Sequence, residues 1–110
     1  MNVVGDVRGR SCLIVDDMCD TGGSLTKVAR ALRGAGAARI DACFTHPVLS
    51  GAAVEQLANS EIEQIIVTNT IPLHDHACEL GKIKVLSIAP LLAEAIKSIH
   101  EETSVSSLFV

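Results

Sequence analysis

Short apolar runs alternate along the chain with segments in which apolar residues recur at helical spacing. The runs predict buried β-strands at residues 11–16, 40–44, 64–68 and 84–88. Between residues 24 and 35, apolar positions such as Leu25, Val28 and Leu32 recur every three or four residues, which predicts a helix that ends at the glycines following it. Further helices are predicted at residues 51–58 and from Pro90 through Ile99, with the proline in the first turn.

This alternation predicts an α/β fold with a parallel sheet and flanking helices, because parallel strands need crossover connections, usually helical ones. No repeat, low-complexity tract or linker divides the sequence, so residues 1–110 are expected to form a single domain. A parallel sheet collects ligand-binding groups at the C-terminal ends of its strands. Asp16, Thr45 and Thr68 fall at such ends, which predicts one site there.

The segment after the first strand, LIVDDMCDTGGSL, carries the candidate chemistry. Two adjacent carboxylates end an apolar strand, and an expected loop at residues 17–24 contains a glycine pair flanked by hydroxyl residues. Glycines let backbone N–H groups turn inward, and a helix start adds its positive dipole end, so the segment suits a phosphate monoester. The acids suit sugar hydroxyls or a hydrated Mg²⁺. The candidate residues are Asp16, Asp17, Asp20, Thr21, Gly22, Gly23 and Ser24.

Two other interpretations compete for this segment. In the first, Gly22 and Gly23 form a simple tight turn, and Asp20 or Ser24 caps the helix. The acidic pair before the loop and the helix directly after it favour the phosphate loop instead. In the second, the acidic pair opens a phospho-receiver domain, but the later strand that should end in an acceptor aspartate runs into Thr68 and Asn69.

The same segment resembles the phosphoribosyl pyrophosphate signature shared by type I phosphoribosyltransferases and ribose-phosphate pyrophosphokinases. The pyrophosphokinases are also similar in four other segments, VVGDVRGR (3–10), FTHPVLSGAA (44–53), VTNTIPL (67–73) and SVSSLF (104–109). The resemblance implies part of a type I phosphoribosyltransferase-like domain and the C-terminal half of a pyrophosphokinase. It implies Mg²⁺-dependent transfer of diphosphate from ATP to ribose 5-phosphate, which gives phosphoribosyl pyrophosphate for nucleotide biosynthesis.

By this resemblance, the loop residues from Asp20 to Ser24 hold the 5-phosphate of ribose 5-phosphate or phosphoribosyl pyrophosphate. Asp16 and Asp17 face the ribose hydroxyls and the nearby metal shell. The family's ATP pocket, mobile basic loop and pyrophosphate loop have no counterpart in the sequence, so no catalytic residue or metal ligand is assigned. The chain alone is expected to be inactive, and to form a homo-oligomer or to join a separate ATP-binding half. A base phosphoribosyltransferase, which would need a hood segment for the base, and a non-catalytic associated or regulatory subunit remain alternatives.

Composition narrows the classes of partner and the compartment. The chain is 48% hydrophobic but 2% aromatic, and its net charge is -4, which argues against nucleic-acid or membrane-surface binding. The first ten residues contain no apolar signal-peptide core, and no apolar run in the sequence approaches the length of a membrane span. The four cysteines lack CxxC spacing, so reduced thiols and a cytoplasmic location are expected. Among them, Cys19 is expected in the exposed loop, without a histidine neighbour that would make it a nucleophile.

Three polar segments outside the loop leave their roles open. His74, His76 and Cys78 could hold a transition metal, but no second ligand cluster completes a site, so a variable surface stretch is expected. His46 precedes Pro47 and could contact a ligand or make a structural hydrogen bond. The tail at residues 104–109 alternates in polarity, and is expected to add as a strand on association.

Overall fold

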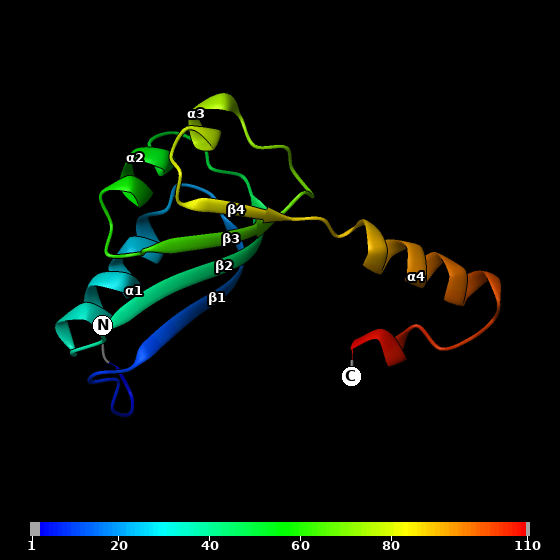
Figure 1. Ribbon diagram of the computed structural model, residues 1–110, viewed down its shortest axis with the longest axis horizontal. Coiled ribbons are helices and arrows are strands. Elements are labelled where there is room, and N and C mark those ends of the chain that lie inside the picture. Colours follow the sequence, from blue (N-terminus) through cyan, green and yellow to red (C-terminus); the bar gives the residue numbers. More distant parts are fainter. Residues whose placement is uncertain (1–2, 110) are drawn as a thin grey trace.

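The computed structural model describes residues 3–109. Helices follow strands along the whole chain (Figure 1). The elements are β1 (Ser11–Cys19), α1 (Gly23–Gly34), β2 (Arg39–Pro47), α2 (Ala53–Ala58), β3 (Gln64–Thr68), α3 (Asp75–Cys78), β4 (Ile83–Leu86), α4 (Ala89–His100) and the 3₁₀ helix η1 (Ser106–Phe109).

The four strands form one parallel sheet in the order β1-β2-β3-β4. In its register, Val15 lies beside Cys43, Cys43 beside Ile66, and Ile66 beside Lys84. The predicted α/β fold with a parallel sheet and flanking helices is therefore confirmed.

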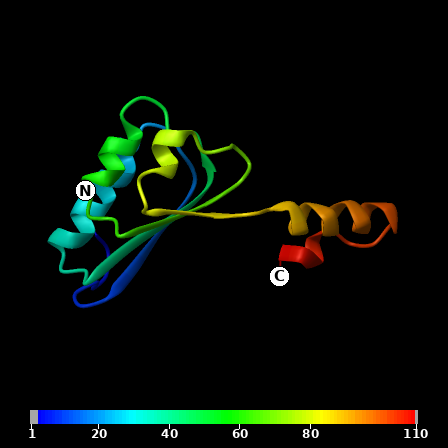
Figure 2. The same cartoon turned by 45° about the horizontal axis from the view of Figure 1, so that its top comes forward.

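The helices that connect the strands lie on one side of this sheet. Because the spatial order of the strands repeats their order in the chain, right-handed crossovers carry every connecting helix to the same face. Figure 2 shows α1, α2 and α3 together on that side. The face that they cover and the face that they leave uncovered therefore have different environments.

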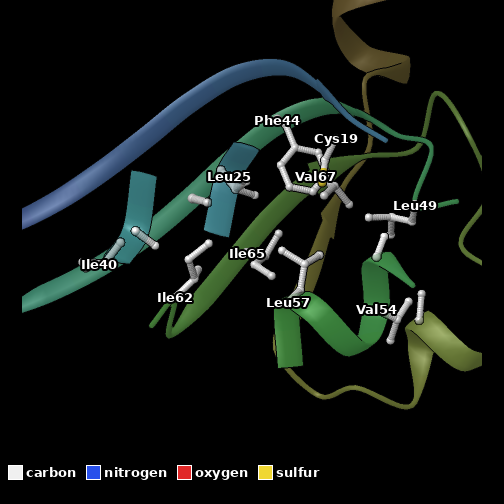
Figure 3. Close-up of a cluster of buried hydrophobic side chains, with 14 of the residues drawn as sticks. Cys19, Leu25, Ile40, Phe44, Leu49, Val54, Leu57, Ile62, Ile65 and Val67 are labelled. Atoms are coloured by element: carbon white, nitrogen blue, oxygen red, sulfur yellow. The ribbon is translucent and has the colours of Figure 1, made fainter. Parts of the chain in front are cut away.

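The core lies between the sheet and these helices (Figure 3). Alternate residues of β2 and β3 point into it, among them Ile40, Phe44 and Ile65, all buried. Leu57 of α2 and Leu25 of α1 cover them from the helical side. With one phenylalanine in this cluster, the core is filled by aliphatic side chains, as the composition predicts.

Several predicted boundaries are wrong. β1 runs on to Cys19, so residues 17–19 are strand rather than loop, because Met18 and Cys19 continue the ladder beside His46 and Pro47. The tail forms the 3₁₀ helix η1 rather than an alternating strand, and it packs against α4.

A short helix was not predicted at all. α3 occupies part of the stretch expected to be a variable surface segment, and its start is capped by His74, whose Nδ1 accepts the N–H of Ala77 at 3.2 Å. The helix from Pro90 is confirmed as α4, with the proline in its first turn.

α4 projects away from the rest of the chain (Figures 1 and 2). None of the residues of Ala89–His100, all of which the structure describes, is buried. The radius of gyration is 16.4 Å, whereas a compact chain of this length has about 13 Å. The extended shape comes from this one helix and the tail that follows it.

Candidate functional site

The loop between β1 and α1 turns on a glycine with a left-handed backbone. Gly22 precedes the first helical residue and has φ 84° and ψ -3°. A residue with a Cβ would be strained in this conformation, because the side chain approaches its own carbonyl. The turn lets α1 begin at Gly23, four residues after the buried end of β1.

The start of α1 is open to a ligand. No side chain caps it and no acidic residue lies in its first turn. The first N–H that bonds back into the helix is that of Thr26, which donates to the Gly22 carbonyl at 3.0 Å. Helix geometry gives the N–H groups before it no intrahelical acceptor, so they and the positive end of the helix dipole are available to an anion.

A hollow of about 210 Å³ lies in front of this helix start. Five of the seven predicted site residues line it, whereas Asp17 and Gly23 do not. Asp16 turns one carboxylate oxygen back to accept the N–H of Asp17 at 2.8 Å. The full lining is Asp16, Met18, Cys19, Asp20, Thr21, Gly22, Ser24 and Leu25.

The segment after β2 braces the loop, a feature that the sequence analysis missed. The N–H of Leu49 donates to the Cys19 carbonyl at 3.0 Å, and the N–H of Ser50 donates to the Asp20 carbonyl at 2.8 Å. The Ser50 hydroxyl also donates to the Asp20 carboxylate. No sequence signal pairs residues 30 positions apart in this way. The two bonds to Ser50 therefore hold Asp20, and with it the loop, in a fixed conformation.

The two glycines of the pair have different structural requirements. A Cβ on Gly22 would lie 3.7 Å from the Ala53 carbonyl oxygen, in addition to the strain at its positive φ. Gly23 has no positive φ, and a Cβ there would meet its nearest neighbour, the Gln56 side chain, at an ordinary 3.8 Å. The fold itself thus needs glycine at position 22 but tolerates a small side chain at position 23.

Cys19 is buried rather than exposed, which corrects the prediction for this residue. Burial, followed by the negative charges of Asp16 and Asp20, raises the pKa of its thiol to about 11. A thiol with so high a pKa stays protonated near neutral pH and is a poor nucleophile. It contributes packing beneath the loop.

The other predicted strand-end residues lie beside the loop rather than in it. Thr45 and Thr68 line an adjoining shallow hollow, and Asp16 borders both hollows. The Thr68 hydroxyl donates to the Thr45 carbonyl at 2.7 Å, and His46 Nδ1 lies 2.8 Å from the Thr70 hydroxyl. The structure thus supports the hydrogen-bonding alternative for His46.

The histidines near α3 have separate partners. His74 caps α3, while His76 Nε2 lies 2.7 Å from Glu55 Oε1 on α2. The thiol of Cys78, which is exposed, donates to the Leu73 carbonyl at 3.9 Å and contacts neither histidine in this way. Within residues 3–109, no group of three or more His, Cys, Asp or Glu side chains is arranged to hold a metal ion.

A larger hollow of about 440 Å³ lies between α1 and α2. It has charges of both signs, Arg30 against Glu55 and Glu61, and it does not include the start of α1. The loop hollow is therefore the better candidate for a phosphorylated ligand.

Comparisons with known proteins show which proteins the chain is similar to. Residues 1–110 match the family model described as phosphoribosyl synthetase-associated domain. The chain is 50% identical to the ribose-phosphate pyrophosphokinase of Ralstonia nicotianae and 53% identical to that of Aquifex aeolicus, in each case over 99% of this chain and 34% of the relative. The solved phosphoribosylpyrophosphate synthetase of Mycobacterium smegmatis is 42% identical, with a TM-score of 0.83 over 90% of this chain and 33% of that one.

The chain thus spans about a third of the length of the relatives that it matches. The expectation that the chain is the C-terminal half of such an enzyme is wrong, because the match covers a third of each relative rather than half. In the part of the chain that the structure describes, no helix has the length and hydrophobicity to cross a bilayer.

Proposed function

The chain belongs to the phosphoribosyl synthetase-associated domain family, and we propose that its β1–α1 loop binds the 5-phosphate of ribose 5-phosphate or phosphoribosyl pyrophosphate. The observation that carries this proposal is the uncapped start of α1, which opens behind Gly22 into a hollow bordered by Asp16. An uncapped helix start with free N–H groups is a ready anion site.

In this proposal the backbone does most of the binding. N–H groups from Thr21 to Ser24 surround the phosphate, and the hydroxyls of Thr21 and Ser24 add donors. Asp20 contributes through its backbone, because Ser50 already occupies its carboxylate, and that bond holds the loop in shape.

The acidic pair takes the sugar end of the ligand. Asp16 lies at the rim of the loop hollow, where a free carboxylate oxygen can accept hydrogen bonds from ribose hydroxyls. Mg²⁺ would arrive with ATP, and the described side chains fit it as partners of its water shell rather than as a closed set of ligands. Asp17, on the next position of β1, is proposed to share that role.

The reaction proposed for the complete assembly is transfer of diphosphate from ATP to the 1-hydroxyl of ribose 5-phosphate. This chain supplies position: it holds the phosphate and the ribose so that the 1-hydroxyl has a fixed direction. The ATP site is proposed to lie on polypeptide outside these 110 residues, either in a longer chain or in a separate partner.

Ribose 5-phosphate binding tests the loop directly. We expect Gly23→Ala to weaken binding about tenfold or more, because a Cβ blocks close approach to the N–H groups and hydrogen bonds to a charged group contribute ~1.5–3 kcal/mol each. Gly34→Ala is the matched control, since Gly34 lies in the same helix with open space around it. Calorimetric or NMR titration of both variants with ribose 5-phosphate and with ribose measures the effect.

Two results would contradict the proposal. One is equal affinity of the Gly23→Ala and Gly34→Ala variants, and the other is equal affinity of the unmodified chain for ribose and ribose 5-phosphate. A separate assay with ATP, Mg²⁺ and ribose 5-phosphate is expected to release no AMP from the chain alone. Enzyme-like turnover would place the ATP site within these residues.

A further inference from the structure

Two consecutive residues after β2 bond to two consecutive carbonyls where β1 ends and the ligand loop begins. The N–H of Leu49 donates to the Cys19 carbonyl at 3.0 Å, and the N–H of Ser50 donates to the Asp20 carbonyl at 2.8 Å. We call Leu49 and Ser50 the brace. The brace is therefore joined to two neighbouring peptide groups of the loop, the one between Cys19 and Asp20 and the one between Asp20 and Thr21.

The backbone of the brace is shaped for this double contact. Leu49 has φ 50°, in the left-handed region that residues other than glycine seldom adopt. Such a conformation can turn successive N–H groups to one side of the chain, as it does here. The side chain of Leu49 is buried, at 3% exposed, and this burial helps to hold the strained backbone in place. The strain is thus located where it orients donors toward the ligand loop.

Ser50 forms a bond with each of its polar groups. Its hydroxyl donates to the Asp20 carboxylate, in addition to the backbone bond, and its carbonyl accepts the N–H of Ala53 at 3.1 Å. Ala53 is the first residue of α2 and is fully buried. Ser50 therefore connects the ligand loop to a fixed point of the core.

The brace determines the direction of N–H groups in the loop. A trans peptide group is planar, so its N–H points opposite to its C=O, and no peptide bond within residues 3–109 is cis. Because the Asp20 carbonyl points to Ser50, the N–H of Thr21 in the same peptide group points away from Ser50. The N–H of Asp20 points away from Leu49 for the same reason. Neighbouring N–H groups that point to one side form a concave anion site.

The loop hollow and the brace lie on different sides of the loop. Asp20 and Thr21 line the hollow, whereas Leu49 and Ser50 do not. In the part of the chain that the structure describes, no backbone carbonyl accepts the N–H of Thr21. This N–H is therefore available to a ligand in the hollow, together with the N–H groups at the start of α1.

We propose that Ser50 is a positioning residue for the phosphate group of the ligand, an inference that rests on the proposed function of the loop. Ser50 does not touch the phosphate. It fixes the peptide group between Asp20 and Thr21, and so directs the Thr21 N–H into the hollow. A loop that is ordered before binding loses less conformational freedom on binding, which strengthens the binding. The hydroxyl matters because it is the second bond that holds Asp20 in this orientation.

Titration of the 110-residue chain with inorganic phosphate and with ribose 5-phosphate, followed by backbone amide NMR, tests this role. Ser50→Ala should weaken the binding of both ligands about fivefold, the factor that corresponds to one lost hydrogen bond. Ser50→Thr keeps the hydroxyl and should restore the affinity. Ser60→Ala is the matched control, because it also removes a bonded hydroxyl, which donates to the Leu57 carbonyl at 2.7 Å beyond the other end of α2.

The amide signal of Thr21 gives a readout that a merely structural role would not change. Both ligands should shift this signal in the unmodified chain, and Ser50→Ala should reduce the shift at saturating ligand while circular dichroism stays unchanged. A second variant shows whether Ser50 acts through its partner in the loop. In an Asp20→Ala background, Ser50→Ala should have no further effect on the affinity, whatever the effect of Asp20→Ala itself.

The possible failures separate this inference from the proposed function. If the unmodified chain binds neither inorganic phosphate nor ribose 5-phosphate, the proposed function of the loop is wrong, and so is the role of Ser50. If the unmodified chain binds them but Ser50→Ala binds as tightly as Ser60→Ala, the loop is a phosphate site that Ser50 does not position. The same conclusion follows if Ser50→Thr binds as weakly as Ser50→Ala, or if Ser50→Ala still weakens binding in the Asp20→Ala background.

Discussion

The two faces of the sheet differ in what covers them and in polarity, since Asp41 and Lys84 lie on the uncovered face beside Leu13 and Ile66 in the register. On β3, Ile65 is fully buried beneath the helices, whereas the next residue, Ile66, is half-buried on the face without helices. The covered face receives its helices from the crossovers of the same chain. The ligand loop belongs to that side, because the first of these crossovers both covers the sheet and opens the start of α1. Binding is therefore proposed on the same face as the packing that stabilises the fold.

The largest difference between the two faces is expected in the free energy of unfolding when one side chain on each face is truncated to alanine. Ile65→Ala is expected to lower the free energy of unfolding by about 2–5 kcal/mol, because it leaves a cavity in the core. Val15→Ala, at an exposed position, should change it by about 0.5 kcal/mol or less. Urea denaturation at a protein concentration too low for association measures both. A large loss of stability for Val15→Ala in the single chain would mean that the face without helices is covered after all.

The main elements could be predicted because their signals are local. Apolar runs located all four strands, and helical spacing located α1 and α4. The extension of β1 to Cys19 could not be predicted, because it depends on pairing with His46 and Pro47 of a strand distant in the sequence. α3 is a single turn with too few residues to show a period.

The candidate site was only partly predictable for the same reason. The glycine pair and the acids mark the loop in the sequence, and five of the seven predicted residues line one hollow. The bracing by Leu49 and Ser50 is invisible to any local pattern, because it joins segments 30 residues apart. The burial of Cys19 was mispredicted because DMCDTGGS has no apolar period, although packing beneath the loop encloses this one thiol.

The alkylation rates of the cysteines should also differ between the two faces, with a smaller effect in free energy than the core truncation. With a pKa of about 11, Cys19 should react with iodoacetamide at pH 8 about 100-fold more slowly than an exposed thiol of ordinary pKa near 9. Cys78, which is exposed, is the internal reference, and Cys43, half-buried on the face without helices, should react at an intermediate rate. Mass spectrometry of the labelled chain resolves the three sites. Cys19 reacting as fast as Cys78 would contradict a closed loop.

The same raised pKa predicts the direction of a stability change at high pH. The Cys19 thiol ionises near pH 9 in the unfolded chain but near 11 in the folded one. Since the unfolded state loses this proton first, the free energy of unfolding should fall as the pH rises from about 9 to 11. Cys19→Ala should reduce this pH dependence, whereas Cys78→Ala should leave it in place.

The smallest effect is expected at the outer surface of the covering helices. His76 and Glu55 join α3 to α2 at 2.7 Å, but both side chains are exposed, so Glu55→Gln should change Tm by about 1 °C or less. The hydrogen bond from His76 holds the pKa of Glu55 below its usual value. The stabilisation that this bond gives the folded state is therefore present above pH 4.5, and it is lost as the pH falls through the lower pKa of the folded state. The Tm values of the variant and the unmodified chain should converge at that low pH.

Glu79→Gln is the control for this comparison, because it removes one negative charge nearby from a side chain that forms no ion pair within residues 3–109. Thermal unfolding of both variants at pH 7 and at pH 3 gives the four values required. If Glu55→Gln lowered Tm by many degrees at pH 7, the covering layer would depend on its surface charges. The burial of Val54 and Leu57 beneath the same helix predicts instead that apolar packing holds the layer on the sheet.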